Sequence, residues 1–396
     1  MKKSIRDRVA IIGTGITKFG ERWDKSPESL ITDAVCEACD EANVDLQKEV
    51  EAGWVGVAYD TTGASANALT DPIALYGKPV TRVENYCCTG MDAFRNACYS
   101  IAAGVYDIVI AAGVEKLLDT GGSGLKIDQM YPHTTLVAQS APGLFAPGAM
   151  RAFKEYGWTK EDLGRVAVKN HHNGVKHPKA HFRREITLET AVNAPMVCSP
   201  LGLFDCCAIS DGSAALILTT PEIAKDKVGE GNYATVKAVA QAVYTRYPFN
   251  DPNYTGISIP STVDAAASAY EQAGITNPMK ELDFGIVHDC FTIAELFHYQ
   301  DLGLCGTGES ADLIREGVTS IDGAFPINPD GGLKCFGHPI GATGCRMVAE
   351  ISRQVLGRAE GYQVKDAKAG LAHNLGGPLS VAMVTIVGTP EWEPGG

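Results

Sequence analysis

Apolar runs that end in glycines and are followed by helical spacing recur along the chain. Arg8–Gly15 predicts a strand and a turn, and Ser29–Ala42 shows the spacing of an amphipathic helix. A second unit repeats this order, with a strand over Val80–Val83, a helix over Met91–Ala102 and a buried strand over Asp107–Val114. Because strands alternate with helices, the pattern predicts an α/β fold with a parallel sheet.

The alternation is interrupted between about residues 115 and 200, where glycine, proline and polar residues dominate. We expect an inserted loop subdomain there. Regular alternation then resumes, and the Pro-, Asn- and Tyr-rich stretch Tyr247–Pro260 is typical of a linker. We therefore expect an N-terminal half over residues 1–255, which includes the loop subdomain, and a C-terminal half over residues 256–396.

Two pairs of segments indicate an internal duplication. Val83–Thr89 and Ile286–Thr292 share the spacing apolar-x-x-x-Cys-x-Thr, and the apolar strand Asp107–Gly113 is similar to Lys368–Asn374. If the halves pack about a pseudo-twofold axis, the two cysteines of the shared spacing meet at the strand ends, where open sheets bind their ligands.

Composition narrows the class of protein. A chain of 396 residues with 45% hydrophobic residues can bury a large core, and the net charge of -13 argues against a nucleic-acid or anionic-membrane partner. No apolar run is long enough to span a bilayer, and Met1–Arg8 is too charged for a signal peptide. Twelve cysteines without an export signal indicate free thiols, so we expect a soluble cytoplasmic protein.

Cys87 is a candidate nucleophile because it precedes the helix at Met91–Ala102. The positive end of a helix dipole and free backbone N–H groups stabilise a thiolate at that position. Cys88 is an alternative nucleophile. Packing alone is the other possible role of the cysteine pair, and it is the more common one for adjacent cysteines. Either thiol needs a base to activate it.

A base is available in Asn328–Gly344, the most glycine-dense stretch of the chain, where His338 stands between Gly337 and Pro339. A turn with a structural histidine and a phosphate-binding loop are the alternatives, although the stretch contains neither of the common glycine-rich phosphate motifs. His373–Gly377 ends another apolar strand, where backbone N–H groups can form an oxyanion hole.

These blocks, in this order, resemble the thiolase superfamily over nearly the whole chain. Cys87-x-Thr89-Gly90 is similar to the nucleophile motif, and Gly337-His338-Pro339 to the catalytic histidine loop. His288-Asp289-Cys290-Phe291 and the C-terminal His373–Gly377 are typical of the sterol-carrier-protein-type and archaeal-type branch. The resemblance implies a five-layered αβαβα thiolase fold built from two similar halves with an inserted loop subdomain.

The resemblance also implies a reaction, the CoA-dependent cleavage of a 3-ketoacyl-CoA or the reverse Claisen condensation. Cys87 would carry the acyl group after His338 has taken its proton. The backbone N–H groups of Cys87 and Gly376 would hold the first oxyanion, and His288 with His338 would stabilise the enolate. Cys290 would act as acid and base at the enolate carbon.

Coenzyme A is expected as a substrate, and no permanently bound cofactor is expected. Because the chain is acidic, the CoA phosphates need a local basic patch, and Arg151–Arg184 holds nine Lys and Arg against three acidic residues. The candidates for phosphate binding in this stretch are Lys176, Lys179, Arg183 and Arg184. The alternative is a solvated basic helix.

No metal site is expected. Cys36-x-x-Cys39 has metal-like spacing but lies within a predicted helix and has no second pair of ligands. A cluster of histidines in the loop subdomain is expected to form a polar surface instead, namely His171, His172, His177 and His181. Cys206 and Cys207 lie in a thiolase-like core block, so we expect them to pack rather than to take part in redox chemistry.

Partners and specificity complete the expectations. The resemblance implies a homo-oligomer, either a dimer or a dimer of dimers, and a small zinc-ribbon/OB-fold protein as a possible second subunit. A catalytically silent acyl-CoA-binding scaffold and a 3-ketoacyl synthase remain alternative functions. Acyl specificity is expected to depend on loop residues between Leu117 and Met150, and neither specificity nor direction follows from the sequence.

Overall fold

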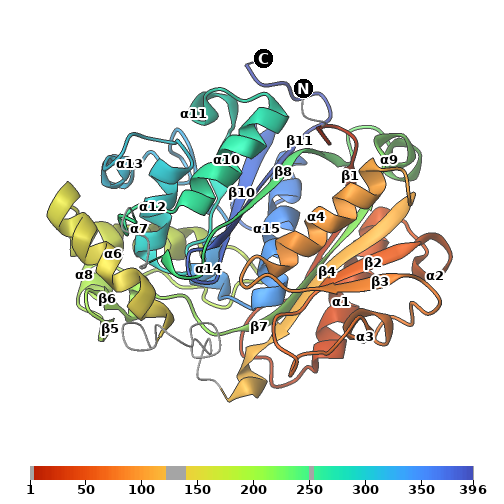
Figure 1. Cartoon of the computed structure of the whole chain (residues 1–396), viewed down its shortest axis with the longest axis horizontal. Helices are drawn as coiled ribbons and strands as arrows, with labels where there is room; N and C mark the ends of the chain where they lie inside the picture. The colour runs from red at the N-terminus through yellow and green to blue at the C-terminus, as the bar shows by residue number, and fades with distance from the viewer. Residues whose placement is uncertain (1–3, 122–139, 249–253, 396) are drawn as a thin grey trace.

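Nine of the described strands form one mixed sheet, in the order β3-β2-β4-β7-β1-β8-β11-β10-β9. The computed structural model describes residues 4–121, 140–248 and 254–395 (Figure 1). The strands of this sheet are β1 (Ala10–Ile16), β2 (Ala52–Gly56), β3 (Val80–Val83), β4 (Ile108–Lys116), β7 (Asp211–Thr219), β8 (Ala234–Val243), β9 (Phe284–Ile286), β10 (Ala369–Gly376) and β11 (Val381–Gly388).

The prediction of a parallel sheet is wrong. Among the described strands, only β2 with β3 and β4, and β9 with β10, pair in parallel, whereas β4, β1, β8 and β10 have antiparallel neighbours. The reason is that β7 and β11 have no crossover helix before them. β7 follows the inserted loop region, and β11 follows β10 through the tight turn at Gly377–Ser380, so each returns antiparallel to its neighbour.

The sheet order is symmetric about the junction of β1 and β8, where Ala10 pairs with Thr235 and Ile11 with Ala234. β9 is the parallel neighbour of β10, as β2 is of β4, so β9 corresponds to β2. The matching of Ile286–Thr292 to Val83–Thr89 is therefore wrong. The place of β3 is taken by Ile327, which bridges to Gly285 in parallel.

Helices complete five layers around the two halves of the sheet, as expected. The helices of these layers are α1 (Pro27–Ala42), α4 (Thr89–Ala102), α10 (Pro260–Ala273), α12 (Thr292–Asp301) and α15 (Ile340–Val355). α1 covers the outer face of β1, β4 and β7, while α10 covers β8 and β11. α4 and α15 pack on each other between the two groups of strands (Figure 1).

Glycines set the spacing of this central layer. A Cβ atom at Gly113 of β4 would overlap the carbonyl oxygen of Gly341, and one at Gly344 would overlap the backbone of Met91. The starts of α4 and α15 therefore touch through their main chains. Every residue of α15 is buried, including the charged Arg346.

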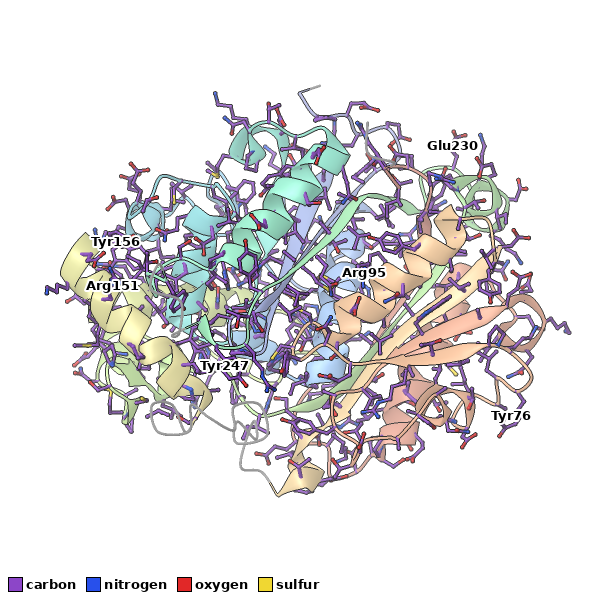
Figure 2. The ribbon with its side chains drawn as sticks, viewed as in Figure 1. Tyr76, Arg95, Arg151, Tyr156, Glu230 and Tyr247 are labelled. Carbon is purple, nitrogen blue, oxygen red and sulfur yellow. The ribbon has the colours of Figure 1, made fainter. Side chains whose placement is uncertain are left out.

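The loop region lies beside the C-terminal half (Figure 1). Its elements are α6 (Ala141–Tyr156), α7 (Lys160–Gly174), α8 (Leu188–Val192), β5 (Met196–Cys198) and β6 (Leu201–Gly202). α7 packs on α12, on α13 (Ser310–Arg315) and on α14 (Gly332–Phe336). Figure 2 shows Arg151 and Tyr156 of α6 on the outer side of this region.

The remaining helices are short surface elements, namely α2 (Leu46–Glu49), α3 (Asn67–Thr70), α9 (Pro221–Val228), α11 (Pro278–Glu281) and the 3₁₀ turns Leu117–Thr120 and Leu203–Asp205. None of the described helices combines the length and apolarity needed to cross a membrane.

Candidate active site

Cys87 lies in the turn between β3 and α4. Tyr86, directly before it, has a φ of 50°, a left-handed conformation that a tyrosine adopts only at an energetic cost. The turn is held by Thr89, whose hydroxyl donates to the Tyr86 carbonyl at 2.5 Å and accepts from the Asn85 N–H at 2.9 Å. This local bonding presents the Cys87 sulfur above the start of α4.

Cys88 has a different environment, which excludes it as the nucleophile. Its thiol is fully buried and donates to the carbonyl oxygens of Asn374 at 3.2 Å and Val381 at 3.5 Å. The side chain of Cys88 therefore ties the turn to the C-terminal half, and Cys87 alone faces the site.

His338 stands on the loop between α14 and α15, and its Nδ1 lies 2.8 Å from the Thr343 hydroxyl. That hydroxyl donates its proton to the Pro339 carbonyl at 2.9 Å, so its oxygen accepts from Nδ1–H. The Nε2 atom of His338 is therefore unprotonated, and it is buried without a hydrogen-bond partner. A bare Nε2 lone pair is what a general base requires.

His288 follows the end of β9, and its Nδ1 accepts from the Asn374 side-chain amide at 2.8 Å. This pairing leaves the proton of His288 on Nε2, as a donor toward the site. A third histidine supports the loop, because His298 Nε2 donates to the His288 carbonyl at 3.1 Å. The Nε2 atoms of the two histidines thus differ in their hydrogen-bonding character: that of His338 can accept, and that of His288 can donate.

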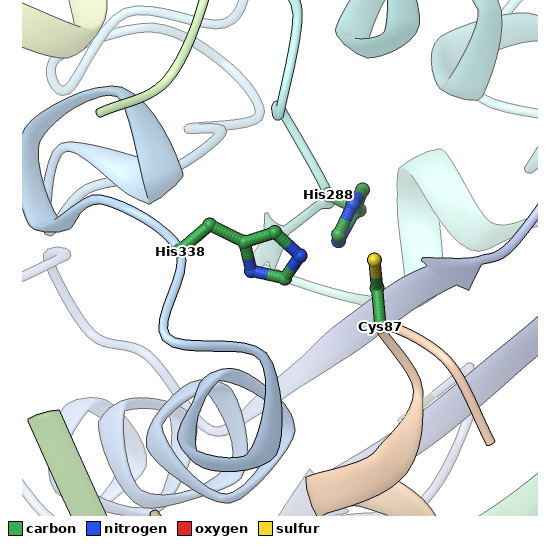
Figure 3. Close-up of side chains that lie close together, drawn as sticks. All are labelled: Cys87, His288 and His338. Carbon is green, nitrogen blue, oxygen red and sulfur yellow. The ribbon is translucent and has the colours of Figure 1, made fainter. Parts of the chain in front are cut away.

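The three groups converge, as Figure 3 shows. The sulfur of Cys87 and one nitrogen from each of His288 and His338 lie within 4.8 Å of one another. Burial raises the pKa of the Cys87 thiol to about 12, although the Gly377 N–H partly offsets this. Burial also lowers the pKa of His338 to about 3 and that of His288 well below its usual value. The resting site therefore holds a neutral thiol between two neutral imidazoles.

Cys290 is buried beside this cluster. Burial raises the pKa of its thiol well above the usual value, and the nearby Cys207 and Cys87 raise it further. Its carbonyl accepts from the Cys207 N–H at 2.9 Å, which joins the loop after β9 to the segment before β7. The structure therefore places both predicted cysteines in one site, together with a third thiol, Cys207, which sequence reasoning assigned to packing.

The backbone donors near Cys87 come from the end of β10. The Gly377 N–H and the N–H of Cys87 itself lie against the sulfur and lower the pKa of its thiol. Gly376 packs directly on this turn, because a Cβ atom there would lie 3.2 Å from the Cys87 nitrogen. Gly376, whose N–H was predicted for an oxyanion hole together with that of Cys87, thus lies at the site, and Gly377 beside it bonds the sulfur through its own N–H.

A buried polar network holds the catalytic loops. The Asp289 carboxylate accepts from the N–H groups of Leu333 at 2.6 Å and Lys334 at 3.1 Å, at the start of α14. The Asn170 amide of α7 donates to Asp289 at 2.8 Å and to Glu295 at 2.7 Å. The loop that carries His288 is therefore fixed directly to the start of α14, the helix before the His338 loop, and α7 holds the same His288 loop through Asn170.

The expectation that the loop-region histidines form a polar surface is wrong for two of them. His177 is buried and pairs with the buried Glu350 at 2.9 Å. His171 is buried between the rings of Phe182 and Phe204 and bonds the Arg184 carbonyl at 3.1 Å. α7 packs against α14, so only its outer side reaches solvent.

The four residues expected near the CoA phosphates differ in their availability. Arg183 and Arg184 are exposed. Lys176 is exposed, with its ammonium 4.1 Å from the centre of the Tyr362 ring. Lys179 forms ion pairs with a glutamate of α1 and another that follows α15. Among the described contacts, Arg183 Nε donates to the Val175 carbonyl at 3.4 Å and the Arg184 guanidinium lies 5.9 Å from the centre of the Phe204 ring, so Lys179 is the one of the four whose charge is ion-paired.

Sequence reasoning assigned no role to Asn374, Thr343, His298 or Glu115. Asn374 and Thr343 lie inside the quoted motifs, three residues or fewer from glycines that were singled out, so their positions carried a signal. His298 and Glu115 reach the site only through tertiary contacts, and no spacing along the chain reveals them. The loop expected to govern acyl specificity includes residues 122–139, which lie outside the described part of the chain.

Comparison with known families gives two matches that together cover most of the chain. Residues 9–222 match the family described as "Thiolase, N-terminal domain", and residues 240–389 match "Thiolase C-terminal domain-like".

Three relatives extend this result. An acetyl-CoA acetyltransferase of Methanothermobacter thermautotrophicus is 39% identical over 386 residues, covering 96% of this chain and 98% of the relative. A benzoylsuccinyl-CoA thiolase subunit of Thauera aromatica is 32% identical over 93% of this chain and 95% of its own length. Human sterol carrier protein 2 is 32% identical over 97% of this chain and 73% of its own length.

Two solved structures share the fold. The complex named "Ltp2-ChsH2(DUF35) aldolase" contains a chain with a TM-score of 0.83 and 26% identity, over 98% of this chain and 100% of that one. Human mitochondrial 3-ketoacyl-CoA thiolase has a TM-score of 0.72 over 98% of this chain and 100% of that one, and its 16% identity shows the fold alone. The thiolase fold predicted from the motifs is confirmed.

Proposed function

The chain belongs to the thiolase family of acyltransferases, and from that premise we propose that it cleaves a 3-ketoacyl-CoA, or forms one, through an acyl group on Cys87. The observation that carries this proposal is the convergence of the Cys87 sulfur with ring nitrogens of His288 and His338. His338 is assigned the role of base because its Nε2 has no proton and no partner. Since both groups rest neutral, the proton moves as the sulfur attacks the substrate ketone.

The next step breaks the bond between carbons 2 and 3 of the substrate. The tetrahedral oxyanion is held by N–H groups at Cys87 and at the Gly376–Gly377 pair. Its collapse leaves the acyl group on Cys87 and releases the thioester enolate of the departing CoA ester. His288 Nε2–H, together with the proton now on His338, stabilises that enolate.

Cys290 is proposed to protonate the enolate carbon. Its raised pKa keeps the thiol protonated, which is the form an acid requires. The Cys290 thiolate then takes the proton of a second CoA thiol, whose sulfur attacks acyl-Cys87, and the departing Cys87 sulfur recovers its proton from His338. In the condensing direction Cys290 gives its proton to the departing CoA, and the resulting thiolate removes a proton from C2 of the second acyl-CoA.

Coenzyme A esters are the proposed substrates, with no permanently bound cofactor. Arg183 and Arg184 are the preferred phosphate ligands because their charges are exposed. Lys176 and Lys179 are second choices. The Lys176 ammonium lies 4.1 Å from the centre of the Tyr362 ring, closer than Arg184 lies to Phe204 at 5.9 Å, and Lys179 is ion-paired. Reversal of these charges should raise KM for CoA with little change in kcat.

We also propose a second subunit, an oligomeric state and a cellular location. The structural neighbour named as a complex with a DUF35 protein supports a small second subunit, which we infer to be of zinc-ribbon/OB-fold type. A dimer or a dimer of dimers is the proposed state of the chain itself. Twelve free thiols are consistent with a cytoplasmic location.

An aldolase is the second candidate function, because the neighbour at 26% identity carries that name. A retro-aldol cleavage of a 3-hydroxyacyl-CoA also releases an enolate, but it forms no acyl-cysteine. The two functions therefore differ in whether Cys87 becomes covalently modified. A silent acyl-CoA-binding scaffold would also leave Cys87 unmodified, while a 3-ketoacyl synthase would not need Cys290.

The test is the intact mass of the purified chain after it is mixed with acyl-CoA donors, namely acetyl-CoA, longer acyl-CoAs and benzoyl-CoA. We expect an acyl adduct that peptide mapping places on Cys87, present in C88A and absent in C87A. The preferred donor then defines the substrate class. If no donor gives an adduct, even with the small subunit added, cleavage of 3-hydroxyacyl-CoAs distinguishes the aldolase from the scaffold.

A further inference from the structure

The unpartnered nitrogen of His338 lies beside two further side chains that bind metal ions strongly. The Cys87 sulfur and nitrogens of His288 and His338 are within 4.8 Å of one another, and none of the three side chains is more than 7% exposed. They come from three separate segments, the turn before α4, the end of β9 and the loop before α15 (Figure 3). This is the donor set of a three-ligand zinc site with an open fourth position.

The separations fit such an ion after small side-chain rotations. Tetrahedral zinc, with bonds of about 2.0 Å to nitrogen and 2.3 Å to sulfur, places its donors about 3.3 to 3.6 Å apart. The donors here are at most about 1.5 Å further apart than that. A χ1 or χ2 adjustment of a cysteine or histidine covers that difference without backbone movement.

The second nitrogen of each histidine already has the support that a metal ligand needs. The Thr343 oxygen accepts the Nδ1–H of His338, so Nε2 is free to bind a cation. Asn374 holds Nδ1 of His288 through its amide, and its own oxygen is buried without a partner. Rotation of that amide by half a turn offers the oxygen to a proton on Nδ1, which leaves the His288 Nε2 as a ligand.

We propose that Cys87, His288 and His338 bind a zinc-class divalent cation when Cys87 carries no acyl group, and that the bound cation blocks the nucleophile. Binding converts the Cys87 thiol to a metal-bound thiolate and releases its proton to solvent. The expectation of no metal site rested on other cysteines and histidines, which lie elsewhere. Cation binding stands independently of the proposed function, whereas competition with acylation rests on it.

The first experiment uses Co²⁺ as the probe, added to the purified full chain after chelator treatment and desalting. We expect one equivalent to bind with a thiolate-to-cobalt charge-transfer band in the near ultraviolet, and Zn²⁺ to displace it. The band should persist in the matched control C88A and vanish in C87A, while H288A and H338A should weaken binding at least ~10-fold. Absence of the band in the wild type, or its persistence in C87A, overturns the proposal.

The second experiment needs no variant and so does not depend on variant folding. Iodoacetamide alkylation of the wild-type chain is followed by peptide mapping, with and without Zn²⁺. We expect Zn²⁺ to slow alkylation of Cys87 at least ~10-fold and to leave the exposed Cys36 unchanged. Equal rates at Cys87 overturn the proposal.

Acyl labelling separates this inference from the proposed function. Loss of acyl-Cys87 formation on adding Zn²⁺, with recovery after a chelator, supports both. A cobalt–thiolate band in a chain that no donor acylates would retain the metal site and reject the thiolase mechanism.

Discussion

The two halves of the sheet use equivalent positions for different purposes. Two residues beyond the last paired position of β2 and β4 stand Ala58 and Glu115, and two beyond that of β9 and β10 stand His288 and Asn374. In each half the second residue reaches across to the first. Glu115 accepts the Ala58 N–H at 3.0 Å, whereas the Asn374 amide bonds the His288 imidazole at 2.8 Å.

The difference shows that equivalent positions in the two halves have different structural roles. Glu115 also accepts the N–H groups of Tyr59 and of Gly341, so it braces the start of α15 from the N-terminal half. Asn374 instead bonds the imidazole of His288, the proposed donor to the enolate. At equivalent strand positions, the N-terminal half therefore carries a carboxylate that holds the backbone in place, and the C-terminal half carries an amide that orients a histidine.

The starts of α4 and α15 make a second comparison, since Cys87 precedes one helix and His338 the other. The residue five places after His338 is Thr343, which fixes the tautomer of the imidazole. The residue five places after Cys87 is Asp92, which bonds Asn85 at 3.2 Å and not the nucleophile. Cys87, the proposed nucleophile, is thus positioned by backbone conformation, and His338, the proposed base, by a side-chain hydrogen bond.

The largest expected effect separates Cys87 from its neighbour. C87A should lower the thiolysis rate by at least ~10⁴-fold, because no acyl-enzyme can form. C88A should keep the rate within about 10-fold of wild type and lose ~1–3 kcal/mol of unfolding free energy, since it removes a buried thiol donor. Steady-state rates and urea unfolding of both variants test this. Equal loss of activity in the two variants would contradict the assignment.

Cys290 tests whether the end of β9 supplies the acid and base. C290A should slow exchange of the C2 protons of acetyl-CoA by about 10³-fold, yet still accept an acyl group on Cys87. Deuterium incorporation and intact mass measure the two steps separately. C207A is the control, a half-buried thiol whose N–H bonds the Cys290 carbonyl, and should slow exchange less than about 10-fold. Wild-type exchange in C290A would remove Cys290 from the mechanism.

The role of Glu115 in the N-terminal half can be tested through the pH dependence of the free energy of unfolding. Burial raises the pKa of Glu115 to about 7, so the native carboxyl holds its proton more tightly than the unfolded one. The stability this provides is full below the usual pKa near 4.5 and is lost as the pH rises through 7. The stability advantage of wild type over E115Q should therefore shrink by about 3 kcal/mol between pH 4.5 and 7. Urea unfolding that shows a constant difference across this range would contradict the raised pKa.

Asn374 gives the smallest expected effect and completes the comparison. N374A should lower kcat/KM by about 10- to 100-fold, because His288 loses the partner that keeps its proton on Nε2. N374D keeps a hydrogen bond to Nδ1 but only accepts, so it should lose as much activity as N374A. Activity restored in N374D would show that His288 does not act as a donor.

Local patterns were sufficient to predict many of the elements. The strand over Val80–Val83 was predicted with its observed bounds, and the helices of α1 and α4 to within two residues, because each has strong apolar periodicity. Strand direction was not predictable in this way. Whether β7 or β11 runs parallel to its neighbour depends on the connection before it, and a strand's own residues carry no record of that.

The same distinction between local pattern and tertiary contact applies to the residues of the site. Cys87, His338, His288 and Cys290 were found because they stand in short motifs at element ends. Cys207 was found as a motif but was assigned to packing, because only the tertiary fold brings it near Cys87. His177 and His171 were placed on the surface because a polar helix gives no sign that another helix will cover it. The sequence around a residue does not show that it is buried when the segment that covers it lies more than 150 residues away. Glu350, which bonds His177, is such a case.

The glycine contacts of the central layer have a consequence for how this enzyme can change. The main chains of α4, β4 and α15 meet at Gly90, Gly113, Gly341 and Gly344, so direct main-chain contacts set how closely the helix starts that follow Cys87 and His338 approach each other. Residues that surround the acyl group can therefore be exchanged while the catalytic span stays fixed. A scaffold of this kind can diversify its substrates by altering its loops, and each new variant inherits a working pair of catalytic groups.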